Sequence, residues 1–158
     1  MKLHELLIPD HISLDFAARD CESIINHLVD LLADTNSIDN RDLAKKLVLE
    51  RERQVGTGIG YGVAIPHTEP GPFPSPQVAF GRLVSGINFH APDGSKARLV
   101  FLLLTPASTP ALHVRLLARI CRLLKSEGLR KRLLEAPNPQ TAAAVIVEAE
   151  ADFPELTP

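Results

Sequence analysis

The run Leu99-Val100-Phe101-Leu102-Leu103-Leu104-Thr105 is the feature that most constrains the fold of this chain. It contains no charged residue and shows no alternation of apolar and polar positions. A strand of this kind is buried on both faces, because either face would otherwise expose leucine or phenylalanine to water. The sheet that contains it therefore needs helices on both sides.

Patterns at helical spacing on both sides of this strand supply the covering layers. Asp20 is a plausible N-cap for the first expected helix, and Asn40 for the second. Helices are expected over residues 21–33, 42–53, 111–125, 129–135 and 141–149, and other strands within 6–15 and at 63–65, 78–84 and 87–89. The expected fold is a single α/β domain over residues 1–158 whose mixed sheet is sandwiched by helices on both faces. Its core is expected at about 3–150, followed by a C-terminal tail at 151–158.

The charge balance and the terminal sequence exclude several function classes. The formal net charge is 17 − 19 = −2, so no basic excess favours nucleic acid or a membrane surface. No apolar run is long enough for a membrane span, and the N-terminus lacks the apolar core of a signal peptide. Cys21 and Cys121 show no metal-ligand or redox spacing. We expect a cytoplasmic protein without cofactor or metal and without direct membrane insertion.

Residues 57–67 read TGIGYGVAIPH and carry the chemistry of the chain. Glycines at every second position allow backbone turns that a Cβ would forbid, and they leave N–H groups that can face an anion. The stretch is therefore expected to form a phosphoryl-binding loop that runs into a short buried strand. The loop residues are Thr57, Gly58, Gly60 and Gly62.

His67 stands at the end of that strand, after Pro66, which restricts the backbone there. An imidazole at the edge of a sheet, beside a loop able to accept negative charge, suits a histidine that carries a phosphoryl group. A neutral imidazole attacks through one nitrogen while an acceptor holds the proton on the other nitrogen. A backbone carbonyl is the expected acceptor.

His113 and Arg51 are the candidates for the rest of this site. His113 lies in the first turn of the helix that follows the buried strand, where ligand sites of α/β sheets gather. Arg51 lies in the last turn of the helix before the glycine loop, and a guanidinium fork binds phosphoryl oxygens in pairs. Simpler roles remain open, since His113 can merely cap its helix and Arg51 can pair with a neighbouring glutamate. His4, His11, His27 and His90 are expected to have packing or surface roles.

Other catalytic motifs are missing. The glycine loop lacks the Gly-Lys-Ser/Thr ending of a P-loop, and its spacing is not that of a dinucleotide fingerprint. No Gly-x-Ser-x-Gly elbow is present. A zinc site at His67 and His113 has no third ligand, which makes a metal-dependent hydrolase a distant alternative.

The run from Arg51 to His67 resembles the phosphorylation site of the fructose/mannitol-type enzyme IIA domains of the phosphoenolpyruvate-dependent phosphotransferase system. Residues 93–94 with 99–106 are similar to that family's later buried strand, and residues 112–119 to its helix with a second active-site histidine. The resemblance covers nearly the whole chain. The lone domain is most similar to the stand-alone nitrogen-regulatory branch.

The resemblance implies roles for the three residues. His67 takes a phosphoryl group from the phosphorylated histidine of an HPr-like carrier, His113 donates a hydrogen bond to that group, and Arg51 helps to neutralise it. The group then passes to an enzyme IIB, or the phosphorylation state is read by regulated target proteins. Thr68 and the pair Val55-Gly56 depart from the family pattern at the rim of the site, where a partner docks.

Two further readings stay open from the sequence. The chain can be a sugar-specific enzyme IIA that serves a separate enzyme IIB, or a binding module that is never phosphorylated.

Overall fold

A computed structural model, which describes residues 1–158, shows a five-stranded sheet in the order β1-β4-β5-β3-β2. The strands are β1 (Ile12–Phe16), β2 (Gly58–Gly60), β3 (Val63–Ala64), β4 (Gln77–Ile87) and β5 (Ala97–Leu104). β1 runs parallel to β4 and β3 runs parallel to β5, whereas β4 pairs with β5 and β2 with β3 in the antiparallel sense. The sheet is therefore mixed, as expected, with the apolar strand β5 at its centre.

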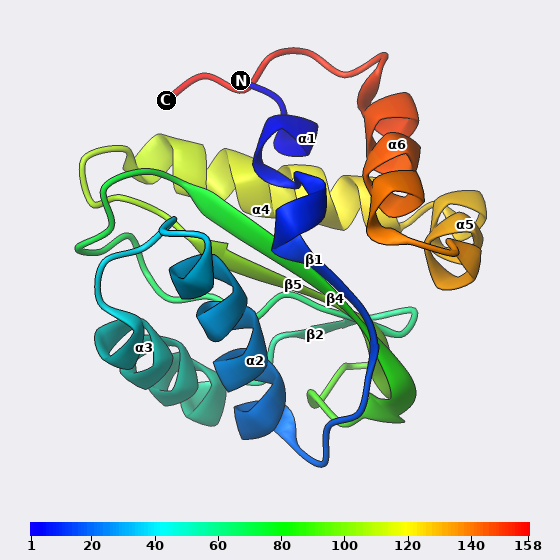
Figure 1. The fold of residues 1–158 in the computed structure, drawn as a ribbon, viewed down its shortest axis with the longest axis horizontal. Helices are drawn as coiled ribbons and strands as arrows, with labels where there is room; N and C mark the ends of the chain where they lie inside the picture. Colours follow the sequence, from blue (N-terminus) through cyan, green and yellow to red (C-terminus); the bar gives the residue numbers. More distant parts are fainter.

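Helices cover both faces of the sheet (Figure 1). One face carries α2 (Cys21–Asp34) and α3 (Arg41–Gln54). The other carries α1 (Leu3–Leu6), α4 (Pro110–Leu124), α5 (Glu127–Glu135) and α6 (Pro139–Glu150), and a 3-10 turn at Pro9–His11 leads into β1. The predicted sandwich is confirmed. None of these helices combines the length and the apolar character needed to cross a bilayer.

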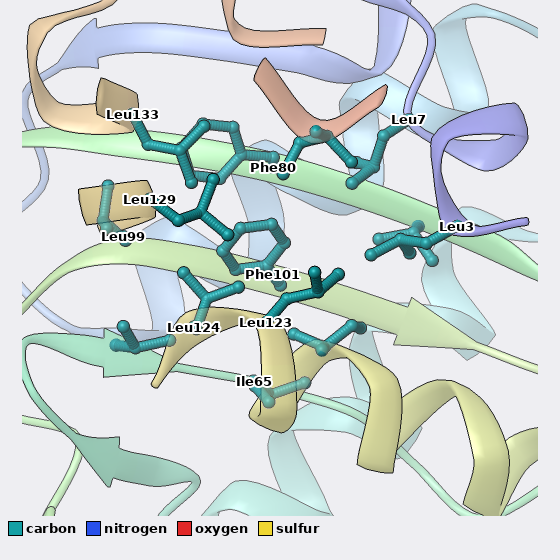
Figure 2. Close-up of a cluster of buried hydrophobic side chains, with 14 of the residues drawn as sticks. Leu3, Leu7, Ile65, Phe80, Leu99, Phe101, Leu123, Leu124, Leu129 and Leu133 are labelled. Atoms are coloured by element: carbon teal, nitrogen blue, oxygen red, sulfur yellow. The ribbon is translucent and has the colours of Figure 1, made fainter. Parts of the chain in front are cut away.

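The side chains of β5 alternate between two separate cores. Leu99, Phe101 and Leu103 pack with α4, α5 and α6, whereas Val100, Leu102 and Leu104 pack with α2 and α3. The Phe101 ring stacks on that of Phe80 in β4, with centroids 4.6 Å apart, within the first of these cores (Figure 2). All six of these β5 residues are at most 1% exposed, so this strand has no solvent face.

The helix caps were predicted correctly and several boundaries were not. Asp20 accepts a hydrogen bond from the Ser23 amide at 2.8 Å, and Asn40 accepts one from the Leu43 amide at 3.0 Å. β4 runs without a break to Ile87, so the expected continuation over 87–89 is not formed beyond that residue, and the short helix α1 was missed. A four-residue helix is too short to show periodicity.

The two ends of the chain meet on the α4 side of the sheet. The fully buried Glu150 carboxylate accepts hydrogen bonds from the backbone amides of Leu3 at 2.7 Å and His4 at 2.9 Å. Its charge is balanced by Arg119, whose guanidinium donates at 2.8 Å. After α6 the chain returns to the domain, where Leu156 is 7% exposed and its amide donates to the Met1 carbonyl at 2.8 Å.

Candidate active site

His67 is held against the end of the central strand. The amide of Leu103 in β5 donates to the carbonyl of Pro66 at 3.0 Å, and His67 itself forms a parallel bridge with Leu103. The backbone at the histidine is thus an extension of β3, fixed to the most buried element of the fold. The imidazole is half-buried at this edge of the sheet.

A backbone carbonyl sets the protonation of the His67 ring. Nδ1 lies 2.7 Å from the carbonyl oxygen of Ile65. Because a carbonyl only accepts, Nδ1 must carry the proton, and in the neutral ring Nε2 has the free lone pair. Burial lowers the pKa of His67, the hydrogen bond to Ile65 opposes that shift, and the charge of Arg51 lowers the pKa further. The ring is therefore neutral at pH 7 and offers Nε2 as a nucleophile, with the kind of acceptor that was expected.

His113 lies beside His67, as the sequence predicted. The two ring centroids are 5.7 Å apart and the planes are inclined by 54°. His113 is 8% exposed in the first turn of α4, and its Nδ1 lies 2.6 Å from the hydroxyl oxygen of Thr105, the residue after β5. Burial lowers the pKa of His113, His67 lowers it further, and Glu69 acts in the opposite direction.

Thr105 was not anticipated from the sequence. It ends the apolar run and looks like a polar stop, and no local pattern indicates that its hydroxyl contacts a residue on the following helix.

Arg51 lines a groove that begins at the residue after His67. The groove has a volume of about 400 Å³, and Thr68 and Glu69, the two residues after His67, form part of its wall. The Arg51 guanidinium donates to the carbonyl of Val55 at 3.1 Å, at the end of its own helix. It forms no salt bridge, so the alternative of pairing with a neighbouring glutamate does not hold. The Arg51 charge lowers the pKa of His67 through space, without a direct hydrogen bond.

Several amides of the glycine loop already have partners within the fold. The Thr57 amide donates to Glu52 at 2.9 Å, and the Thr57 hydroxyl donates to the same carboxylate. The Gly58 amide donates to the carbonyl of Phe89 at 3.0 Å, and the Gly62 amide donates to the Ser95 hydroxyl at 3.1 Å. The amides of Thr57, Gly58 and Gly62 are therefore engaged inside the fold and are not open to an anion in this structure.

The position of Gly60 and Gly62 also argues against that role. With φ values of +96° and +75° they flank Tyr61, and together they form the turn between β2 and β3. Val63, opposite Gly60, pairs with Leu99, whereas His67 pairs with Leu103. Four residues along a strand correspond to about 13 Å. These two glycines therefore shape a hairpin at a distance from the imidazoles.

The remaining histidines lie outside this site. His27 stacks on Phe16 with ring centroids 4.0 Å apart, and His90 is exposed. His4 bonds to Glu150 through Nδ1 at 2.8 Å, and His11 bonds to the Leu6 carbonyl at 2.9 Å. No group of three or more histidine, cysteine, aspartate or glutamate side chains is arranged to hold a metal ion.

Comparison with known proteins places this arrangement in a family. Residues 5–149 match the family described as "Phosphoenolpyruvate-dependent sugar phosphotransferase system, EIIA 2". A fructose-specific EIIA component from Haloferax volcanii is 39% identical over 137 residues, which cover 87% of this chain and 89% of that protein. A nitrogen regulatory protein from Bradyrhizobium diazoefficiens is 34% identical over 149 residues, covering 92% of this chain and 95% of that one.

Solved structures show the same relationship. The crystal structure of nitrogen regulatory protein IIA-Ntr from Neisseria meningitidis superposes with a TM-score of 0.84 at 26% identity, covering 91% of this chain and 98% of that one. The enzyme IIA of the Escherichia coli mannitol system, solved in complex with phosphorylated enzyme IIB, shares the fold with a TM-score of 0.74 at 19% identity, covering 88% of this chain and 95% of that one. This chain therefore belongs to the type 2 EIIA family and is a phosphocarrier component of the phosphotransferase system.

Proposed function

We propose that His67 is the phosphorylated residue, and that it accepts its phosphoryl group from a phosphorylated HPr-type carrier in the cytoplasm. The observation that carries the proposal is the hydrogen bond from His67 Nδ1 to the Ile65 carbonyl at 2.7 Å, which leaves Nε2 free. As the Nε2–P bond forms, the donor's P–N bond breaks and its electron pair returns to the donor imidazole. The Nδ1 proton stays where it is, so no base is needed.

The neighbouring residues stabilise the transferred charge. Phosphoryl transfer depends on positioning and electrostatic stabilisation more than on covalent help from the protein. His113, with its ring centroid 5.7 Å from that of His67, donates a hydrogen bond to a phosphoryl oxygen. Arg51, whose charge already acts on His67, offsets the negative charge from the side of the groove.

The acceptor that we propose is an enzyme IIB of the fructose type. The 39% identity to a fructose-specific EIIA component favours it, because that relative matches this chain over almost its whole length. The second candidate is a nitrogen-regulatory role, in which target proteins read the phosphorylation state of His67. The 34% identity to a nitrogen regulatory protein and the TM-score of 0.84 to IIA-Ntr favour that role.

Phosphorylation is tested by incubation with radiolabelled phosphoenolpyruvate, enzyme I and an HPr-type carrier. The chain should gain an acid-labile, base-stable label, and His67→Ala should gain none while remaining folded. His90→Ala is the matched control, because His90 is exposed and outside the site. A His67→Ala variant that is labelled as strongly as the unaltered protein would refute the assignment.

The acceptor is tested by adding purified enzyme IIB of the fructose type to the labelled chain. Transfer of label to that protein within seconds supports the sugar relay. Label that stays on the chain, with partners that bind only one of His67→Ala and His67→Asp, supports the regulatory role instead.

A further inference from the structure

The Thr105 hydroxyl is buried and has one possible partner. Thr105 is 0% exposed, and its hydroxyl oxygen lies 2.6 Å from His113 Nδ1 with no other hydrogen bond. The backbone carbonyl of the same residue accepts from the Gly71 amide at 2.9 Å, which ties the end of β5 to the segment after His67. The position of the hydroxyl is set by the end of β5 on one side and by α4 on the other.

Proton counting decides the direction of this hydrogen bond. If His113 Nδ1 donated, the Thr105 hydroxyl proton would be buried without any acceptor, which is costly. If the hydroxyl donates, its proton has an acceptor. The oxygen lone pair that then stays unpaired costs less free energy than an unpaired buried O–H proton. The hydroxyl therefore donates and Nδ1 accepts. The neutral His113 ring must then carry its proton on Nε2.

We propose that Thr105 is a positioning residue that holds His113 in the Nε2–H form, so that His113 donates a hydrogen bond to the phosphoryl group on His67. This inference rests on the proposed function of His67. Nε2 is the one nitrogen of His113 without a partner. In the opposite tautomer Nε2 would direct a lone pair at the phosphoryl oxygens and would repel them.

The two rings are thereby held in opposite protonation patterns. The Ile65 carbonyl keeps the proton of His67 on Nδ1, and the Thr105 hydroxyl keeps the proton of His113 on Nε2. One ring offers a lone pair and the other offers an N–H, while both remain neutral. The site therefore accepts a charged group without first losing or gaining a proton.

The ¹⁵N chemical shifts of the His113 ring in the unphosphorylated protein test the proposal directly. We expect the signature of a protonated Nε2 and an accepting Nδ1 at pH 7.5. Thr105→Val should convert this to a mixture of tautomers and slow single-turnover transfer from a phosphorylated carrier on the order of tenfold. Thr105→Ser, which keeps the hydroxyl, should restore both the shifts and most of the rate.

Two results would overturn the proposal. One is a His113 ring protonated on Nδ1 in the unaltered protein, a measurement that requires no variant to fold. The other is a folded Thr105→Val protein with unchanged tautomer and unchanged rate, which would leave the threonine a packing role only. The shifts are measured without phosphate, so a failure of His67 to be phosphorylated is recognised separately.

Discussion

Replacing Gly60 by alanine separates a structural role of the glycine loop from a catalytic one. Gly60 has φ +96°, a conformation that L side chains rarely adopt, and an added Cβ would lie 3.0 Å from Asp93 Oδ2. Asp93 is not free to move away without loss. Its carboxylate accepts from the amides of Tyr61 and Ser95, each at 2.9 Å, and these bonds join the hairpin turn to the loop before β5.

Two costs set the magnitude of the effect. The unfavourable backbone conformation costs about 1–3 kcal/mol. Displacing Asp93 from its two hydrogen bonds adds a smaller cost, because this carboxylate is exposed and keeps its contacts with water. We expect Gly60→Ala to lower the free energy of unfolding by about 2–4 kcal/mol. At about 2–4 °C per kcal/mol for a chain of this size, Tm should fall by about 5–15 °C.

Urea unfolding and phosphoryl uptake, measured on the same samples at 25 °C, provide the test. Uptake per folded molecule should equal that of the unaltered protein, because Gly60 is a hairpin residue about 13 Å along the strand from His67. Gly94→Ala is the matched control, since Gly94 has φ +74° with open space around it, so only backbone strain of about 1–2 kcal/mol applies. A Gly60→Ala protein of normal stability that takes up no phosphate would refute this reasoning.

Two further predictions concern the charges at the site. Arg51→Ala should slow phosphoryl transfer to His67 on the order of a hundredfold. Arg51→Lys should restore only part of the rate, because an ammonium lacks the guanidinium fork. An unchanged single-turnover rate in both variants would mean that Arg51 is only a surface cation. Burial lowers the pKa of both His67 and His113 below the ordinary value of 6.5. On acidification these two histidines are therefore protonated in the unfolded chain at a higher pH than in the folded protein. The free energy of unfolding should therefore fall as pH decreases below about 6.5, and urea titrations at pH 5.5 and 7.5 should show a smaller difference for the His67→Gln/His113→Gln double variant.

Local patterns predicted the elements that depend on neighbouring residues. Asp20 and Asn40 cap helices whose free amides lie three residues further on, so sequence spacing alone identifies them. The unbroken apolar run 99–105 predicted the central strand, since its burial follows from composition. The meeting of His67 and His113 followed because each stands at the end of an element that borders β5.

The predictions that were wrong concern features that depend on partners far away in the chain. The glycines between 57 and 67 suggested free amides, yet the groups that occupy the loop amides include Phe89, Asp93 and Ser95, roughly thirty residues later. Which donors such a loop keeps free is decided by tertiary contacts. Helix α1, which is too short to show periodicity, also depends on a distant partner, because the carboxylate that accepts from its first amides belongs to Glu150, 147 residues beyond Leu3.

The meeting of the two chain ends has a consequence for how this domain can be combined with others. A polypeptide that enters at Met1 and leaves at Pro158 does so from one place, because the Leu156 amide donates to the Met1 carbonyl. Such a unit can be inserted into a larger protein as a cassette without stretching its linkers. A segment of the fructose-specific EIIABC component of Bacillus subtilis is 35% identical to this chain over 146 residues, which are 92% of this sequence and 23% of that longer protein.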